Sequence, residues 1–196
     1  MALNNINEMF DAENFRSMGH DLIELLTEYL HGSLEGEGEV LAWKSPQQES
    51  LRWQSSLPRQ GELTSESLIS FIREEVLANT LRVHHPRNLG HQVAPPLPIA
   101  ALCDLVAALT NQAMAVYETG PSATMLERQV LSWLSTLIGW DNAEGILTSG
   151  GAQANLTALL AARQSMAGHD VWRHGSAGEM RILASEHAHY SLNFGT

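Results

Sequence analysis

The sequence is poor in two residues on which covalent chemistry often depends, since it contains one cysteine, Cys103, and one lysine, Lys44. A single cysteine excludes an internal disulfide, and its place in an apolar helical stretch predicts a buried thiol and a cytoplasmic setting. All the other basic residues are arginine. Chemistry that needs a lysine amine therefore has one candidate in this chain.

Long apolar runs and an excess of basic charge are also missing. No stretch approaches the roughly 20 apolar residues of a membrane span, and the N-terminus lacks the basic and apolar segments of a secretion signal. Acidic residues number 22 against 11 basic ones, which gives a formal net charge of -11. We therefore expect neither a nucleic-acid nor a membrane partner, because such a charge repels both polyanions and anionic surfaces.

Helical periodicity is the main pattern near the N-terminus. Apolar residues recur at every third or fourth position over residues 11–31, with Asp11 as a plausible N-cap. Thr64 or Ser65 can cap a second helix that ends near residue 79. These signals predict two amphipathic helices.

Glycine and proline interrupt the periodicity over residues 32–61, which predicts an extended connector anchored by Trp43 and Trp53. We interpret residues 1–81 as an N-terminal helical segment and residues 82–196 as the start of a larger domain.

Two helices are predicted in the middle of the chain. Pro98 is suited to the first turn of a helix over residues 98–115, and this helix should be buried because it is apolar almost all round. A second helix follows Pro121, where Thr124 and Glu127 have the spacing of a capping box.

The last third of the sequence predicts a strand, a helix and a second strand. Residues 145–148 and 181–184 are short apolar runs, and residues 153–164 between them are rich in alanine and leucine. This order indicates a βαβ unit with two parallel strands, and hence an α/β fold.

The segment Ser149-Gly150-Gly151-Ala152 lies between the first predicted strand and the helix. Free N–H groups at a helix N-terminus favour an anion, and glycine allows a phosphate to approach the backbone closely. An ordinary strand-to-helix turn explains the glycines equally well. The turn matches neither the Walker pattern nor the GxGxxG fingerprint, which favours a phosphate ligand other than a nucleotide.

Polar and aromatic residues gather after the second predicted strand, in SEHAHYS at residues 185–191. Ligands bind at this edge of open α/β sheets, although a solvated loop or a metal-binding histidine pair are alternatives. Because alternate residues of an extended chain point in opposite directions, only one of His187 and His189 is expected to face a ligand.

Two further clusters carry weaker signals. HHPRNLGHQ, residues 84–92, combines three histidines with an arginine and suggests anion or substrate contact, although solvated histidines are common. YETGP, residues 117–121, predicts a turn that can bring an aromatic ring to a site.

Five blocks of the sequence, in this order, resemble group II pyridoxal-phosphate decarboxylases, which include the aromatic amino-acid, glutamate, histidine and tyrosine decarboxylases. The blocks are HHPRNLGHQ, NQAMAVYETGP, WLSTLIGW, LTSGGAQANLTALLAAR and ILASEHAHYS. The resemblance implies an α/β chain of fold type I, here an N-terminal helical segment plus the first βαβ part of the large domain. It also implies pyridoxal 5'-phosphate as the cofactor, and decarboxylation of an L-amino acid to an amine and carbon dioxide as the reaction.

The resemblance assigns expected roles to single residues. Ser149, Gly150, Gly151 and Ala152 match the segment that holds the cofactor phosphate. His189 matches the family histidine that stacks on the pyridine ring beside the scissile carboxylate, so it is expected to be both cofactor-binding and catalytic.

His91, Gln92 and Ala94 match family positions on the substrate side of the pocket. The family's N-terminal helices pack across a homodimer interface, so the resemblance also implies a homodimer for the complete enzyme.

The Schiff-base lysine of the family has no counterpart here, because Lys44 lies in the predicted connector and no family motif surrounds it. We therefore expect an N-terminal fragment that is inactive alone. An alternative is an inert truncated homologue that at most associates with a full-length decarboxylase. A third interpretation keeps the fold but assigns the reaction of an aminotransferase, another lyase or an aldolase. The SEHAHYS and HHPRNLGHQ segments favour decarboxylation over these reactions.

Overall fold

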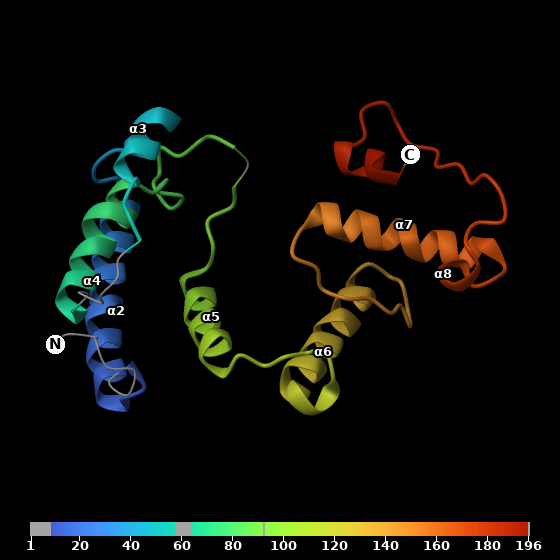
Figure 1. The fold of residues 1–196 in the computed structure, drawn as a ribbon, viewed down its shortest axis with the longest axis horizontal. Helices are drawn as coiled ribbons and strands as arrows, with labels where there is room; N and C mark the ends of the chain where they lie inside the picture. The colour runs from blue at the N-terminus through green and yellow to red at the C-terminus, as the bar shows by residue number, and fades with distance from the viewer. Residues whose placement is uncertain (1–8, 58–63, 92, 196) are drawn as a thin grey trace. The chain divides into compact units, whose positions relative to one another are not determined.

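A computed structural model describes residues 9–57, 64–91 and 93–195 of the chain (Figure 1). The chain divides into two compact units, Met1–Cys103 and Asp104–Thr196. The division at residue 81 into a helical segment and the start of a large domain stays a prediction.

Two long helical stretches lie side by side in the first unit (Figure 1). Helix α2, Ala12–Leu34, begins after Asp11, whose carboxylate accepts a hydrogen bond from the Asn14 N–H at 2.8 Å. Helix α4, Ser65–Phe71, begins after the Thr64 cap and continues as the π-helix η1, Ile72–Val76, and the 3-10 helix η2, Leu77–Asn79. Both predicted helices and their caps are confirmed.

The predicted connector contains a helix, so its description as purely extended chain is wrong. Helix α3, Pro46–Arg52, starts with a capping box in which Ser45 and Gln48 bind each other's backbone N–H groups. Trp53 packs edge-on against Phe71, with ring centroids 5.9 Å apart. Trp43 is 72% exposed and is not an anchor.

Helix α5, Pro98–Thr110, starts at the predicted proline, but the predicted burial of this helix is wrong. All its residues are exposed, including Cys103, for which we expected a buried thiol. An apolar surface on every side requires neighbours on every side, and the described residues do not supply them.

The second unit contains α6, Pro121–Leu137, α7, Gly151–Ala167, α8, Val171–His174, and the 3-10 helices η3, Tyr117–Thr119, and η4, Tyr190–Gly195. The capping box predicted for α6 is not formed, because the helix begins three residues before Thr124. The Thr124 hydroxyl instead donates to the carbonyl of Gly120 at 2.8 Å, and Glu127 accepts from the N–H of Leu147 at 2.7 Å.

The described residues contain the predicted helix of the βαβ unit but no β-strand (Figure 1). Residues 145–148 and 181–184 lie without regular structure at the positions of the two predicted strands. A strand is stabilised by a ladder of backbone hydrogen bonds, and no such bond joins these described segments to each other. The two-strand part of the α/β prediction is therefore not observed, whereas its helix is longer than expected.

Candidate cofactor site

The N-terminus of α7 is open to a ligand. The helix begins at Gly151, and no side chain caps it at Gly150. A Cβ atom added to either glycine would meet no atom within 4 Å. Unpaired N–H groups and the helix dipole favour an anion at this end. The assignment of Gly150, Gly151 and Ala152 to a phosphate site stays a prediction.

Ser149 already has a partner in this turn, which the sequence analysis missed. Its N–H and its hydroxyl both donate to Oε1 of Gln153, at 3.2 and 2.6 Å. A glutamine at the third position of a helix commonly reaches back to the preceding turn. The spacing of Ser149 and Gln153 in the sequence was therefore a signal from which this contact could have been predicted.

His189 lies close to the same helix through a short hydrogen-bonded chain. Its Nδ1 atom lies 2.8 Å from the hydroxyl of Ser191 and accepts from the Ser191 N–H at 3.2 Å. Asn155, in the second turn of α7, donates to the Ser191 hydroxyl at 2.8 Å. The Tyr190 ring lies beside the imidazole, with centroids 4.2 Å apart. Helix α7 thus carries the glycine turn and also supports His189.

His187 has a different environment, although not for the reason predicted. Glu186, His187 and Ala188 lie in a turn and bend rather than in extended chain, so the argument from alternating side chains does not apply. The imidazole of His187 is 88% exposed and lies 3.6 Å from the Glu186 carboxylate. The two histidines differ because Ser191 holds only one of them.

The residues predicted to lie near the substrate belong to the first unit. His91 is exposed and has a positive φ of 61°, Ala94 is exposed, and Gln92 lies outside the described residues. The rest of this cluster is not uniformly solvated, because His84 contacts the carbonyl of Pro96 at 2.8 Å and His85 is buried. A substrate role for His91, Gln92 and Ala94 stays a prediction.

The only lysine of the sequence is engaged in the first unit. Its Nζ atom donates to Asn79 at 2.6 Å and lies 3.7 Å from Glu49. Burial acts to raise the pKa of the Glu49 carboxyl, but hydrogen bonds from Trp53 and Arg52 and the charges of Arg52 and Lys44 hold that pKa below its usual value. Lys44 thus belongs to a surface network of ion pairs around α3.

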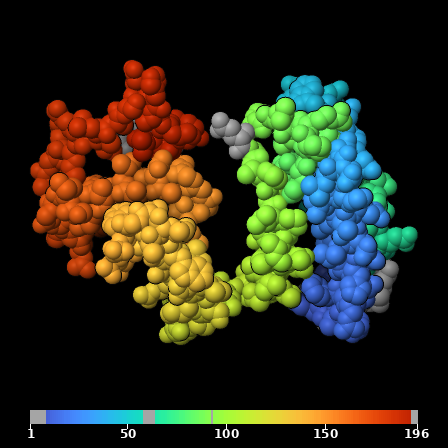
Figure 2. Space-filling model, turned by 180° about the vertical axis from the view of Figure 1, so that it is seen from behind, coloured from blue at the N-terminus to red at the C-terminus, as the bar shows by residue number. Residues whose placement is uncertain are grey.

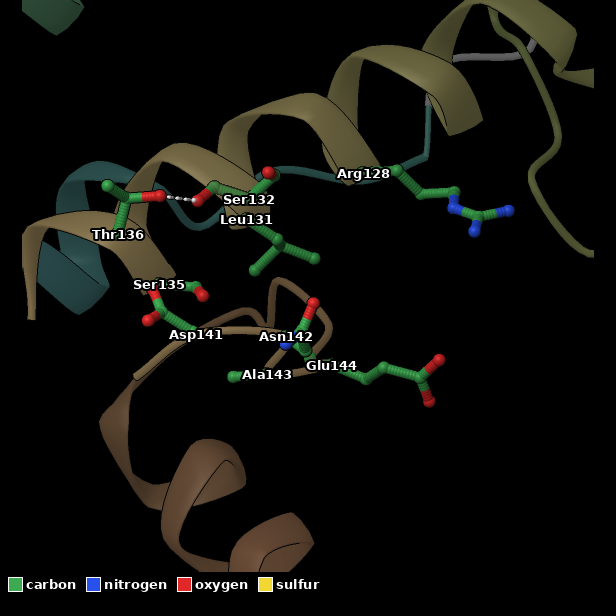
Figure 3. Close-up of a pocket in the computed structure, with 10 residues that line it drawn as sticks. Arg128, Leu131, Ser132, Ser135, Thr136, Asp141, Asn142, Ala143 and Glu144 are labelled. Carbon is green, nitrogen blue, oxygen red and sulfur yellow. Dashed lines mark hydrogen bonds between the residues drawn. The ribbon is translucent and has the colours of Figure 1, made fainter. Parts of the chain in front are cut away.

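A cavity of about 870 Å³ in the second unit lies between α6 and the loop that follows it (Figure 3). Figure 3 shows Arg128 and Glu144 extending outward from it, and the Ser135 hydroxyl is bound to the carbonyl of Trp140. No residue of the predicted cofactor site lines this cavity.

Among the described residues, no three histidine, cysteine or acidic side chains could hold a metal ion together.

Comparison with known proteins defines the class of this chain. Residues 46–195 match the pyridoxal-dependent decarboxylase conserved domain, so the chain belongs to this family. Members of the family are carboxy-lyases that use pyridoxal 5'-phosphate.

Two curated relatives are similar over most of the chain. An L-2,4-diaminobutyrate decarboxylase of Acinetobacter baumannii is 28% identical over 179 residues, which is 84% of this chain and 32% of that protein. An aromatic-L-amino-acid decarboxylase of Bacillus atrophaeus is 28% identical over 194 residues, or 95% of this chain and 37% of that protein. The chain therefore spans about a third of the length of these relatives.

A solved structure shares the fold. The glutamate decarboxylase domain of a diaminobutyrate-pyruvate transaminase and L-2,4-diaminobutyrate decarboxylase from Vibrio parahaemolyticus has a TM-score of 0.76 and 24% identity. The match covers 93% of this chain and 41% of the solved chain.

Among the residues that our structure describes, no helix is both long and apolar enough to cross a membrane.

The start of α7 fits the phosphate of the family's cofactor. The open space at Gly150 and Gly151 leaves room for an anion beside the backbone, and the uncapped helix end offers N–H donors.

Proposed function

We propose that this chain forms the phosphate-binding and ring-facing part of an enzyme that decarboxylates an L-amino acid to an amine and carbon dioxide. The observation that carries the proposal is that α7 presents an uncapped N-terminus and also supports His189 through Asn155 and Ser191.

The residues divide the work between binding and orientation. The N–H groups of Gly151 and Ala152, with Gly150 and Ser149 beside them, hold the phosphate. His189 would contact the cofactor ring and would orient the carboxylate that leaves. Pyridoxal 5'-phosphate, when bound, supplies the electron-withdrawing ring for the reaction.

The substrate is assigned no more finely than an L-amino acid. The names of the two relatives refer to diaminobutyrate and to aromatic amino acids. We propose that His91, Gln92 and Ala94 contribute to this choice, as their family positions imply. We also propose a cytoplasmic homodimer for the complete enzyme, which the exposed apolar surface of α5 and the single cysteine support.

We propose further that the 196-residue chain alone does not catalyse decarboxylation. Its only lysine, Lys44, is bonded to Asn79 beside α3, and the other basic residues are arginine. A second candidate function, in which the chain would also be inactive, is that of an inert homologue that associates with a complete decarboxylase. Carbon dioxide release by the isolated chain, at rates well above those of free pyridoxal phosphate, would disprove the proposed inactivity.

The phosphate role is tested by Gly151→Val, measured as the dissociation constant of pyridoxal 5'-phosphate from the whole chain by titration calorimetry. The branched side chain obstructs approach to the backbone, so we expect affinity to fall about tenfold or more, equivalent to about 1.4 kcal/mol. Gly178→Val is the matched control, because Gly178 also has open space around it but lies outside the site. Equal losses in the two variants, or none in either, would exclude the proposed phosphate site.

The two candidate functions are separated by joining residues 1–191 to the remaining part of a decarboxylase relative. If this chain carries a working half-site, the joined protein releases carbon dioxide from an amino acid. A folded joined protein that binds the cofactor but releases none would favour the inert homologue.

A further inference from the structure

We infer that Ser191 and Asn155 are positioning residues that fix both the orientation and the tautomer of His189. The inference rests on the proposed function for its chemical purpose, because it concerns the histidine expected to orient the carboxylate. Its geometry is independent of any cofactor.

The first step concerns which partner donates at Nδ1 of His189. The Ser191 N–H lies 3.2 Å from this atom, and a backbone N–H can only donate. Nδ1 must therefore accept, which it can do only when it carries no proton.

The second step concerns the Ser191 hydroxyl, whose oxygen lies 2.8 Å from the same Nδ1 atom. The side-chain amide of Asn155 donates to this oxygen at 2.8 Å. Asn155 can only donate here, so among the described residues His189 Nδ1 is the one acceptor within hydrogen-bond distance of the Ser191 hydroxyl, and the hydroxyl proton is directed to it. The hydrogen bonds run in one direction, from Asn155 to Ser191 to His189, and both donors at Nδ1 select the same tautomer.

The third step concerns what is left on the outer edge of the ring. Ser191 is fully buried whereas His189 is exposed, so the ring is held from one side only. In the neutral ring the proton resides on Nε2, which forms no hydrogen bond within the part of the chain that the structure describes. His189 therefore presents a fixed N–H donor outward, suited to a carboxylate oxygen.

The test is nuclear magnetic resonance of the whole 196-residue chain with nitrogen-15 in its histidines. Spectra are recorded about two pH units above the usual imidazole pKa of about 6.5. We expect His189 to show a protonated Nε2 and a bare Nδ1, whereas His187, which lacks a serine anchor, shows a mixture of the two tautomers. Equal tautomer populations at the two rings would overturn the inference.

Asn155→Asp gives the sharpest variant. A carboxylate accepts the Ser191 O–H, so the serine oxygen is left to accept from Nδ1–H, while the Ser191 N–H still donates to Nδ1. The two tautomers of His189 then compete, and the nitrogen shifts of its ring should move towards those of a mixture. Ser191→Ala removes the hydroxyl but keeps the backbone donor, so it should move the tautomer populations of His189 part of the way towards the mixture at His187, whereas Ser191→Thr should retain the original pattern because it keeps the hydroxyl. An unchanged His189 tautomer in a folded Asn155→Asp chain would contradict the inference.

The cofactor plays no part in these spectra, so the outcome is separate from the fate of the proposed function. A fixed tautomer in a chain that fails to bind pyridoxal 5'-phosphate would support the positioning role and count against the phosphate site. Tight binding of pyridoxal 5'-phosphate by a chain with mixed His189 tautomers would support the phosphate site and count against the positioning role.

Discussion

The two histidines of residues 185–191 illustrate what a single side chain needs in order to act in catalysis. His187 has solvent around most of its ring, with one carboxylate 3.6 Å away. His189 has its Nδ1 edge bound by Ser191 and its face beside Tyr190. A reacting group contributes most when its geometry is set before the substrate arrives, and only His189 meets that condition.

This contrast predicts different costs for two alanine variants of the protein rebuilt by joining residues 1–191 to a relative's remaining part. His189→Ala should lower the turnover number by a factor on the order of 10² or more, because a positioned catalytic group is lost. His187→Ala should leave turnover nearly unchanged. Turnover numbers and cofactor dissociation constants of both variants decide the matter, and similar losses at the two positions would place the catalytic role elsewhere.

Single residues also mark where sequence reasoning stops. The glycine turn at Gly150 and Gly151 could be recognised because its signal is local. Asn155 and Ser191 could not, because they are 36 positions apart and meet only after the chain has folded. The partners of a functional residue are therefore harder to predict than the residue itself.

At the scale of elements, the helices of the first unit follow rules that can be read within a few residues. Asp11, Ser45 and Thr64 each accept a hydrogen bond from an N–H in the first turn of α2, α3 or α4. The residues that precede α6 and α7 are glycines and supply no such side chain, although the Gln112 amide oxygen accepts from the Ala123 N–H in the first turn of α6. The predicted strands failed for the opposite reason, because a strand depends on distant segments that pair with it.

The cap of α2 gives a stability prediction. Asp11→Ala should lower the free energy of unfolding by about 1 kcal/mol, since an N–H of the first turn loses its acceptor. Asp21→Ala, in the middle of the same helix, should change it by less than about 0.5 kcal/mol. Urea unfolding followed by circular dichroism measures both, and Asp11→Asn should retain the cap. Equal effects at residues 11 and 21 would show that the cap contributes nothing.

The connection between α7 and α8 contains a pH-sensitive contact. His169 places Nε2 3.0 Å from the carbonyl of Gly175 and Nδ1 2.8 Å from that of Ala167. Two carbonyl acceptors require protons on both nitrogens. The hydrogen bond to Gly175, then that to Ala167, and the charge of Asp170 raise the pKa of His169 above its usual value, against the effect of burial.

The sign of the resulting pH dependence follows from the raised pKa. The folded state binds the proton more tightly than the unfolded chain, so the stabilisation is present below the unfolded pKa of about 6.5 and is lost as the pH rises through the higher folded value. We expect the thermal midpoint of the chain to fall over this interval. His169→Gln should reduce that fall, whereas His174→Gln, at an exposed position of α8, should not. A fall of the same size in all three proteins would remove His169 as its cause.

At the scale of the whole chain, apolar surface is left largely uncovered. Leu25 and Val171 are the only large apolar side chains among those described that are buried, and many others are exposed. The atoms of α5 lie at the surface in the space-filling view (Figure 2). Exposed patches of this kind promote association. The apolar sequence of α5 predicted that other residues must pack against this helix. It could not identify those residues, because they lie on surfaces that the composition of the helix does not specify.

We therefore expect the isolated chain to self-associate as its concentration rises, as measured by sedimentation velocity. Introducing charge on α5 with Val106→Glu and Leu109→Glu, whose side chains are 61% and 67% exposed, should reduce association without loss of helix content. Glu13→Gln on α2 is a control for a change of surface charge away from α5. A chain that stays monomeric over the whole concentration range would contradict the expectation.

The hydrogen bonds between Ser149 and Gln153 hold the turn at residues 149–152, the proposed phosphate site, in place without a ligand. Because Gln153 holds both donors of Ser149, the backbone before α7 is fixed during folding rather than when a ligand arrives. The conformational entropy of this turn, about 1–2 kcal/mol for each ordered backbone residue, is then lost before binding. A phosphate that binds Ser149 would replace the Gln153 oxygen as the acceptor, and the backbone would lose little further conformational freedom. Association should therefore be fast, because no loop has to rearrange first.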